Sequence, residues 1–319
     1  MTHADPILVV GGGVIGLTTA VVLAESGFPV VVKTAEPPEH STSAVAGALW
    51  GPWMVDPRDR VLPWAKQTLD ILTDLAEEAS TGVRIASGIE VSTTYHEPPE
   101  WARLLSDRRA CRPDELPPGY CYGTFYSAPL LDMPEYLSYL TTRLKRAGGR
   151  LDIARITSLR AADNAQVIVN CTGIGARELV PDPDLYPVRG YHVAVTNPGL
   201  TNFIEADTGD DSEFIAIYPH RDHVLLGGTA EKDVWERDPD PGIAHRILAR
   251  CRSIDPRLAD AQVIGHRVGL RPTRQDIQLE AEELPVGWII HNYGHGGAGV
   301  SLSWGCARTV ADIVSILID

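Results

Sequence analysis

The chain has 319 residues and carries 42 Asp and Glu side chains against 28 Lys and Arg, which gives a net charge of −14. This excess of negative charge disfavours nucleic acid and anionic membranes as partners. The length is sufficient to bury a large core and is compatible with two domains. The five cysteines are scattered without the spacing of a zinc site, so we expect no metal and a reducing, cytoplasmic location.

The first elements predicted form a strand, a glycine-rich turn, a helix and a second strand. Ile7–Val10 is an apolar run of strand length, and the turn Gly11–Gly16 follows it directly. The helix Leu17–Ser26 and the strand Val30–Val32 complete the unit. A GxGxxG motif in this context is typical of dinucleotide binding, because the helix N-terminus presents free N–H groups to a pyrophosphate.

Two other interpretations of this unit need to be weighed. The uncharged run from Ile7 to Ala24 is nearly long enough for a membrane span, but the glycines in its middle argue against one. Glu36 has the spacing of an acid that holds a ribose hydroxyl. Lys33, however, directly follows the second strand and could meet a 2′-phosphate, so the motif alone leaves NADP open.

The middle of the chain is predicted to contain two helices and several strands. The helices are Arg60–Ala79 and 132–147, the second opened by a capping box of Asp132 and Glu135. The strands expected here are Val83–Ile85, Ile89–Thr94, Tyr122–Ala128, Leu151–Ile156 and Val167–Asn170.

From Tyr186 onward the pattern changes to short strands joined by short turns, which favours an antiparallel sheet. The elements expected there are strands Tyr191–Val195, Phe214–Tyr218, His223–Leu226, Ala261–Leu270 and Trp288–His291, and helices Ile243–Cys251 and Val300–Leu317. We therefore predict an α/β fold with a Rossmann-like dinucleotide-binding domain (1–52, 130–184 and 286–319). A mainly antiparallel substrate domain (53–129 and 185–285) would complete it, the chain passing between the two more than once.

A second glycine-rich stretch, Ile289–Gly299, again has the pattern of a strand, a turn and a helix. It resembles the signature of the D-amino-acid oxidase family. Further motifs of that family occur in the same order at Val9–Leu17, Ala44–Trp50, 170–173, 226–228 and 268–274. The resemblance covers nearly the whole chain and implies FAD rather than NADP as the cofactor.

The resemblance also implies the chemistry. Members of this family transfer a hydride from the α-carbon of a D-amino acid to flavin N5. The imino acid then hydrolyses to a 2-oxo acid and ammonia, and dioxygen reoxidises the flavin to give hydrogen peroxide. Related amine, glycine or imino-acid oxidases, a flavin dehydrogenase and a flavin-binding protein without turnover are the alternatives.

Residue roles follow by position from the same resemblance. Arg271 matches the arginine that binds the substrate carboxylate, and Gly297 matches the glycine whose carbonyl accepts the substrate amine. The expected cofactor contacts are Gly11, Gly13, Val14, Ile15, Gly16, Glu36, Ser41, Thr42, Gly47, Ala48, Leu49, Ile156, Cys171, Thr172, Gly173, Arg271, Gly296, Gly297, Gly299, Val300 and Ser301.

The substrate end departs from the family pattern. Ala216 stands where a carboxylate-binding tyrosine is usual, and Tyr218, two residues along the same strand, is predicted to face the same pocket. Trp53 and Leu49 are the other expected pocket residues. Ser212 replaces a lid tyrosine, and the acidic loop 205–211 is the expected substitute for the lid. We therefore expect a larger or less usual substrate, and count a homodimer among the assemblies to test.

The histidines near these motifs have simpler interpretations. His291 and His295 are expected to serve packing and hydrogen bonding near the flavin, together with Tyr293. His220 and His223 flank a hairpin turn and are expected to be solvated.

Overall fold

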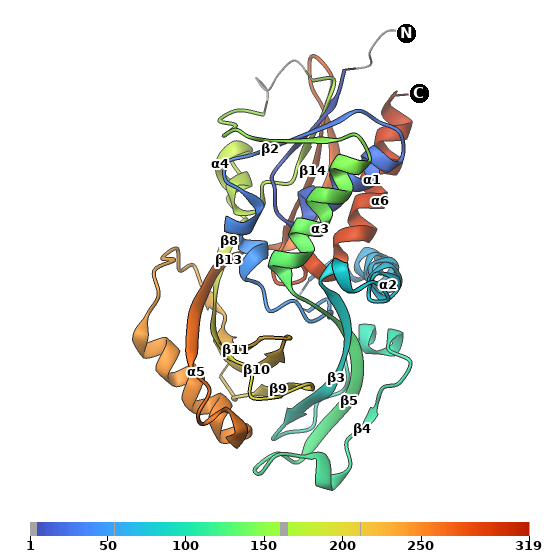
Figure 1. Cartoon of the computed structure of the whole chain (residues 1–319). Helices are drawn as coiled ribbons and strands as arrows, with labels where there is room; N and C mark the ends of the chain where they lie inside the picture. Colours follow the sequence, from blue (N-terminus) through green and yellow to red (C-terminus); the bar gives the residue numbers. More distant parts are fainter. Residues whose placement is uncertain (1–4, 54, 160–164, 211, 319) are drawn as a thin grey trace.

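The computed structural model describes residues 5–53, 55–159, 165–210 and 212–318, and these form one 14-stranded mixed sheet with helices packed against it (Figure 1). The strands follow the order β4-β5-β3-β9-β10-β11-β8-β13-β14-β7-β1-β2-β6, and β12 pairs with β8 beside this path. The order separates an antiparallel end from a parallel end, as the α/β prediction requires.

The parallel end carries the first glycine motif. Its strands are β1 (Ile7–Val10), β2 (Val30–Thr34), β6 (Arg150–Ile153), β7 (Val167–Asn170) and β14 (Trp288–His295). Every residue of β1 and β7 is buried, which suits central strands covered on both faces. Figure 1 shows helices α1 (Val14–Glu25), α3 (Met133–Arg146) and α6 (Gly299–Ile318) packed beside these strands, with α2 (Arg58–Leu75) below them.

The antiparallel end is built from the middle of the chain. Its strands are β3 (Val83–Ser92), β4 (Arg109–Ala110), β5 (Tyr122–Leu131), β8 (Tyr186–Thr196), β9 (Phe203–Asp207), β10 (Glu213–Pro219), β11 (His223–Thr229), β12 (Glu231–Lys232) and β13 (Val263–Glu283). Helix α5 (Pro241–Ile254) covers the outer face through Ile243, Ile247 and Cys251, and α4 (Ala176–Leu179) is a single turn. The predicted domain boundaries stay a prediction, because β8, β13 and β14 join both ends in one sheet.

Most of the predicted elements are present, but two strand predictions differ from the structure, and three strands, β4, β9 and β12, were not predicted. Val83–Ser92 is one strand where two were expected. Gly88 does not break it, because this residue pairs with Phe203 of β9 at a distance that leaves no room for a Cβ. Strand β13 continues past Pro272 to Glu283 through an irregularity in its pairing with β14, so the predicted end at Leu270 is wrong. Half of the expected capping box of α3 is present: the Asp132 carboxylate accepts a hydrogen bond from the Glu135 N–H at 3.5 Å, whereas the Asp132 N–H donates to the Gly82 carbonyl at 2.8 Å.

One helix of the described residues, α6, is long and apolar enough to cross a membrane by length and composition. It packs against α1 and α2, and 50% of its most apolar window is buried, as in the core helix of a globular protein. The Ile7–Ala24 run, which raised the same question in the sequence, is a strand followed by a turn and a helix.

Candidate active site

A cavity of about 2100 Å³ runs from the first glycine turn to the strands of the antiparallel end. The predicted cofactor residues that line it are Gly11, Gly13, Val14, Ile15, Glu36, Ser41, Thr42, Gly47, Ala48, Leu49, Ile156, Cys171, Thr172, Gly173, Arg271, Gly296, Gly297, Gly299, Val300 and Ser301. Gly16 does not line it. The volume is larger than that of an ordinary small-molecule site and is sufficient for a dinucleotide together with a substrate.

The first glycine turn is too tight for any side chain at two positions. Gly11 has a φ of +119°, and a Cβ there would lie 2.2 Å from the Cys171 carbonyl oxygen. A Cβ on Gly16 would lie 2.0 Å from the Gly11 carbonyl oxygen. Gly16 therefore allows α1 to pack closely against the turn, as the third glycine of this motif does, and does not itself line the cavity.

The N-terminus of α1 opens into the cavity beside Ser43, a residue that the sequence interpretation passed over. The Val14 N–H donates a hydrogen bond to the Ser43 hydroxyl at 2.9 Å. A Cβ on Gly13 would lie 3.0 Å from the same oxygen. The bare turn, the hydroxyl and the free N–H groups of the helix fit the phosphates of a dinucleotide.

Arg271 and Gly297 meet in the cavity, as the resemblance implied. The Arg271 guanidinium lies against Gly190, where a Cβ would approach its Cζ, Nη1 and Nη2 atoms to 2.7 Å, and Nη1 donates to the Thr229 carbonyl at 2.9 Å. A Cβ on Gly297 would lie 3.6 Å from Arg271 Cδ. Burial lowers the pKa of Arg271 from its usual value, but an arginine remains charged after such a shift.

Tyr218 lines the cavity in the predicted place, but its hydrogen bond is not the expected one. A Cβ on Gly47 would lie 2.5 Å from Tyr218 Cε2, so the ring packs against the backbone of the Gly47 loop. The Tyr218 hydroxyl donates to a carboxylate oxygen of Glu205. With that proton engaged, the hydroxyl is not available to donate to a substrate carboxylate in this arrangement.

The remaining predicted pocket residues divide into two groups. Trp53, 57% exposed, and Leu49 line the cavity. Ala216 is completely buried, pairs with Gly227 across β10 and β11, and does not line the cavity. Asp211 of the acidic loop lies outside the described residues.

Several lining residues were missed by the sequence interpretation. Buried His192 has its pKa lowered to about 3, first by burial and then by the charges of Arg271 and Arg267, so it is neutral in the cavity. Glu90 and Tyr126 also line the cavity. Glu90 stands between the apolar residues Ile89 and Val91 in the sequence. Because successive side chains of a strand point to opposite faces, this pattern could have indicated that Glu90 faces away from the core side of the strand.

Glu90 and Glu205 form an acid pair at the substrate end. They are register partners on the parallel strands β3 and β9. Burial is the main cause that raises the pKa of Glu90 to about 7, and the charge of Glu205 adds to it. Burial also raises the pKa of Glu205, while hydrogen bonds from Tyr218 and Tyr126 oppose the rise.

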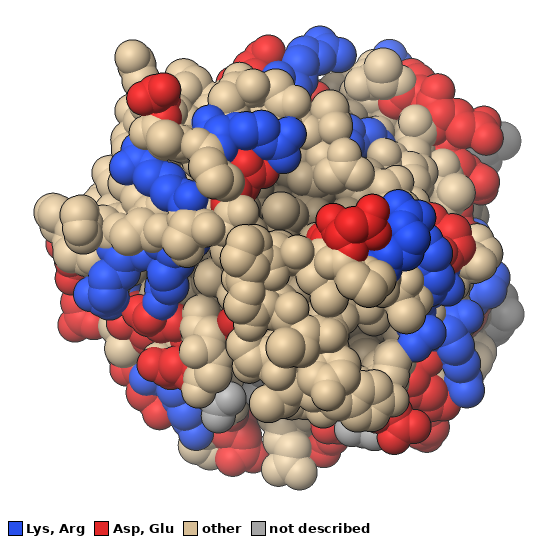
Figure 2. Space-filling model, turned by 90° about the horizontal axis from the view of Figure 1, so that it is seen from below, with Lys and Arg blue, Asp and Glu red and all other residues tan. Residues whose placement is uncertain are grey.

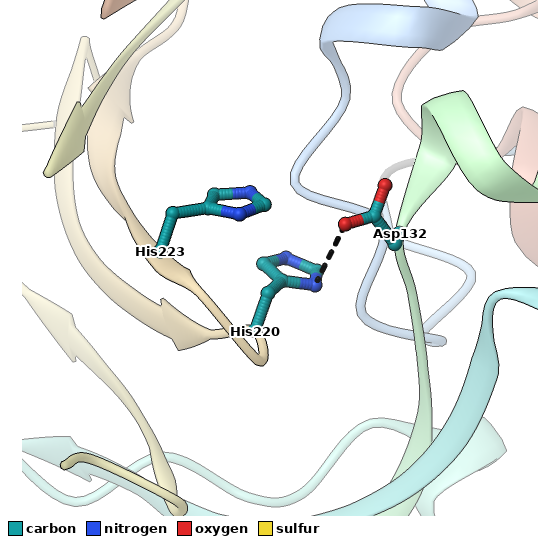
Figure 3. Close-up of side chains that lie close together, drawn as sticks. All are labelled: Asp132, His220 and His223. Atoms are coloured by element: carbon teal, nitrogen blue, oxygen red, sulfur yellow. Dashed lines mark ion pairs between the residues drawn. The ribbon is translucent and has the colours of Figure 1, made fainter. Parts of the chain in front are cut away.

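His220, His223 and Asp132 gather outside this cavity (Figure 3). Only 7% of His220 is exposed, so the expectation of solvated histidines is wrong there: the hairpin turn packs against the start of α3. The two imidazole rings stack with centroids 4.7 Å apart, and His220 Nδ1 lies 4.0 Å from Asp132 Oδ2.

This cluster has the ligand types of a metal site but an unfavourable charge environment. Burial is the main cause that lowers the pKa of His220 to about 3, and Arg84 and Arg267 add to it. The same guanidinium groups would repel a metal cation. Asp132 also caps α3, so the prediction of no metal is retained.

The C-terminal histidines have hydrogen-bonding and packing roles. His291 bonds to Asn170 and Glu282, both at 3.3 Å. Tyr293 donates to Asp182 at 2.8 Å. Burial lowers the pKa of His295 to about 3. His295 Nε2 is buried without a hydrogen-bond partner among the described residues, and the expectation that this group does not supply the acid or base of a reaction stays a prediction.

Comparisons with known proteins agree with this geometry. The family described as DAO, FAD dependent oxidoreductase, matches residues 6–313. D-amino-acid oxidases of Rubrobacter xylanophilus and Streptomyces coelicolor are 47% and 46% identical, over 95% and 97% of this chain and 94% and 96% of theirs. The crystal structure of glycine oxidase from Geobacillus kaustophilus has a TM-score of 0.82 at 22% identity over 99% of this chain and 95% of that chain, a likeness of fold alone. The chain belongs to the DAO family of FAD-dependent oxidoreductases.

Proposed function

We propose that this protein is an oxidase that oxidatively deaminates a D-amino acid to a 2-oxo acid, ammonia and hydrogen peroxide. The observation that carries the proposal is the contact of Arg271 and Gly297 in the same cavity as the dinucleotide-binding turn. A guanidinium binds a carboxylate through two parallel hydrogen bonds, which fixes the orientation of an amino acid. The relatedness to D-amino-acid oxidases supports the handedness of the substrate.

The residues present fit FAD. The bare glycine turn and the N-terminus of α1 suit its pyrophosphate, and the second glycine turn, Gly296 to Gly299, precedes α6, whose N-terminal N–H groups suit the electron-rich edge of a flavin ring. Ser43 and Ser301 supply hydroxyl groups at these two turns. FAD, when bound, supplies the hydride acceptor for the substrate α-carbon.

The work of the protein is then orientation and electrostatics. Arg271 would hold the substrate carboxylate, and the Gly297 carbonyl would accept a hydrogen bond from the substrate amine. His192, kept neutral by burial, adds no positive charge to the cavity. The apolar side chains Leu49 and Trp50 line the same cavity and would reduce the access of water to a bound substrate.

The test is turnover in air with paired D- and L-amino acids, glycine and simple amines, with hydrogen peroxide as the readout. We expect peroxide with D-amino acids and none with their L-enantiomers. Peroxide only with glycine or amines would favour the related oxidases instead. Oxidation of D-amino acids only with an added electron acceptor would identify a dehydrogenase and contradict dioxygen as the acceptor.

Three further features belong to the same proposal. Dioxygen as the electron acceptor, a cytoplasmic location and assembly as a homodimer remain predictions. On the face shown in Figure 2, acidic and basic side chains both lie around a broad middle region that is formed by other residues.

A further inference from the structure

The substrate end of the cavity has an unusual charge distribution. Glu90 and Glu205 stand side by side on β3 and β9, and Asp207 follows on β9. Of the groups that act electrostatically on Glu90, Arg108 alone is positive, while Glu205 and Asp207 are negative. The imidazole of His96 lies 3.9 Å from Asp207 and is exposed. The carboxylates therefore outnumber the guanidinium in this part of the cavity.

Two neighbouring carboxylates alone do not make a binding site, but Glu205 is held by a built arrangement. Tyr126 donates to its Oε2 atom at 3.0 Å, and Tyr218 donates to its Oε1 atom. These tyrosines are only 2% and 6% exposed. Two hydroxyl donors, one on each oxygen, favour the ionised carboxylate and fix its position.

Glu90 differs from its partner because its carboxylate lies open to the cavity. It is exposed and has no hydrogen-bond or ion-pair partner among residues 5–53, 55–159, 165–210 and 212–318, so a ligand in the cavity can reach it. An ammonium or guanidinium group placed beside Glu90 and Glu205 would be attracted by both carboxylates.

A substrate bound by its carboxylate at Arg271 could bring a cationic group to Glu90 and Glu205. Arg271 and the two acids line the same cavity, and Tyr218, whose hydroxyl bonds to Glu205, lines it as well. A molecule anchored by its carboxylate at Arg271 would approach the acids with its side chain. Lysine, ornithine and arginine have long side chains that end in the required charge.

We propose that Glu90 and Glu205 form a subsite for the cationic side chain of the substrate, so that the protein prefers basic D-amino acids. This inference rests on the proposed function and specifies its substrate class. Tyr126 and Tyr218 are positioning residues that hold Glu205.

The test compares D-arginine with D-citrulline, which has nearly the same shape but an uncharged side chain. Charge-assisted hydrogen bonds of this kind predict a kcat/KM ratio of roughly 10 to 100 in favour of D-arginine. The D-lysine to D-norleucine ratio should show the same preference. Glu90→Gln and Glu205→Gln should each reduce the ratio at least severalfold. Glu77→Gln, an exposed change after α2 outside the cavity, should leave it unchanged.

The outcomes separate this inference from the proposed function. Equal kcat/KM values for D-arginine and D-citrulline in the unaltered protein would overturn the subsite while retaining D-amino-acid oxidation. Failure of every D-amino acid would overturn the proposed function itself. If one glutamine variant does not fold, the other variant and the ratio of the unaltered protein still decide the question.

Discussion

Gly190→Ala is the sharpest perturbation of the substrate carboxylate site, because it acts on Arg271 without removing it. The added Cβ would lie 2.7 Å from three guanidinium atoms, so the head of the side chain must move. Gly190 does not have a positive φ, and its crowded neighbour is the flexible end of an arginine, so the fold should tolerate alanine. The expected damage is therefore to binding.

The magnitude follows from the hydrogen bonds that a displaced guanidinium loses. Bonds to a charged group are worth about 1.5–3 kcal/mol, which corresponds to a loss of roughly 10- to 150-fold in kcat/KM. The assay is steady-state kinetics with the best D-amino acid, with the visible flavin absorbance and a thermal melt measured on the same preparation. We expect KM to rise with flavin content retained and only a small change in Tm.

Gly265→Ala is the matched control. It lies on the same strand as Arg271, and a Cβ there would meet nothing within 4 Å. It should leave kinetics and Tm unchanged. Unchanged kcat/KM in Gly190→Ala as well would refute the assignment of Arg271 as the carboxylate ligand.

Three other perturbations test separate parts of the account. The pKa of Glu90 is raised to about 7, so its negative charge is present above this pH and lost below it. The ratio of kcat/KM for D-arginine to that for D-citrulline should therefore rise about tenfold from about pH 6 to about pH 8. A flat pH profile of this ratio would contradict the role of Glu90. Gly11→Ala should destabilise the fold by several kcal/mol, roughly 3 or more, and prevent flavin binding, because its Cβ would overlap the Cys171 carbonyl; a normal melt and a normal flavin spectrum would show that the turn is not as tight as described. Tyr218→Phe removes a donor to Glu205 and should lower kcat/KM for D-arginine roughly 5- to 150-fold, which corresponds to about 1–3 kcal/mol. Unchanged kinetics would argue against any role of that hydroxyl.

The cofactor end of the site could be predicted from the sequence because it depends on local patterns. A strand, a glycine turn and a helix at Ile7–Glu25 fix the geometry within one short segment. The cavity position of Arg271 and Gly297 likewise followed from two short family motifs, 268–274 and Ile289–Gly299. Gly16 belongs to the same motif but does not line the cavity, because it allows α1 to pack closely against the turn.

The substrate end could not be predicted because it depends on pairing between distant strands. The Glu90–Glu205 pair exists only through the register of β3 with β9, a strand that the hydrophobic pattern did not reveal. The same limit explains His220, whose burial comes from the contact of a hairpin with the start of α3. Tyr218 was correctly expected at the cavity, but its partner Glu205 lies on another strand.

The most direct test of the account is anaerobic mixing of the purified protein with one D-amino acid and, separately, with its L-enantiomer, followed by the visible spectrum. We expect a flavin spectrum that is bleached by the D-enantiomer and unaffected by the L-enantiomer. A protein that binds no FAD, or a bound flavin that neither enantiomer of any amino acid tested reduces, would contradict it.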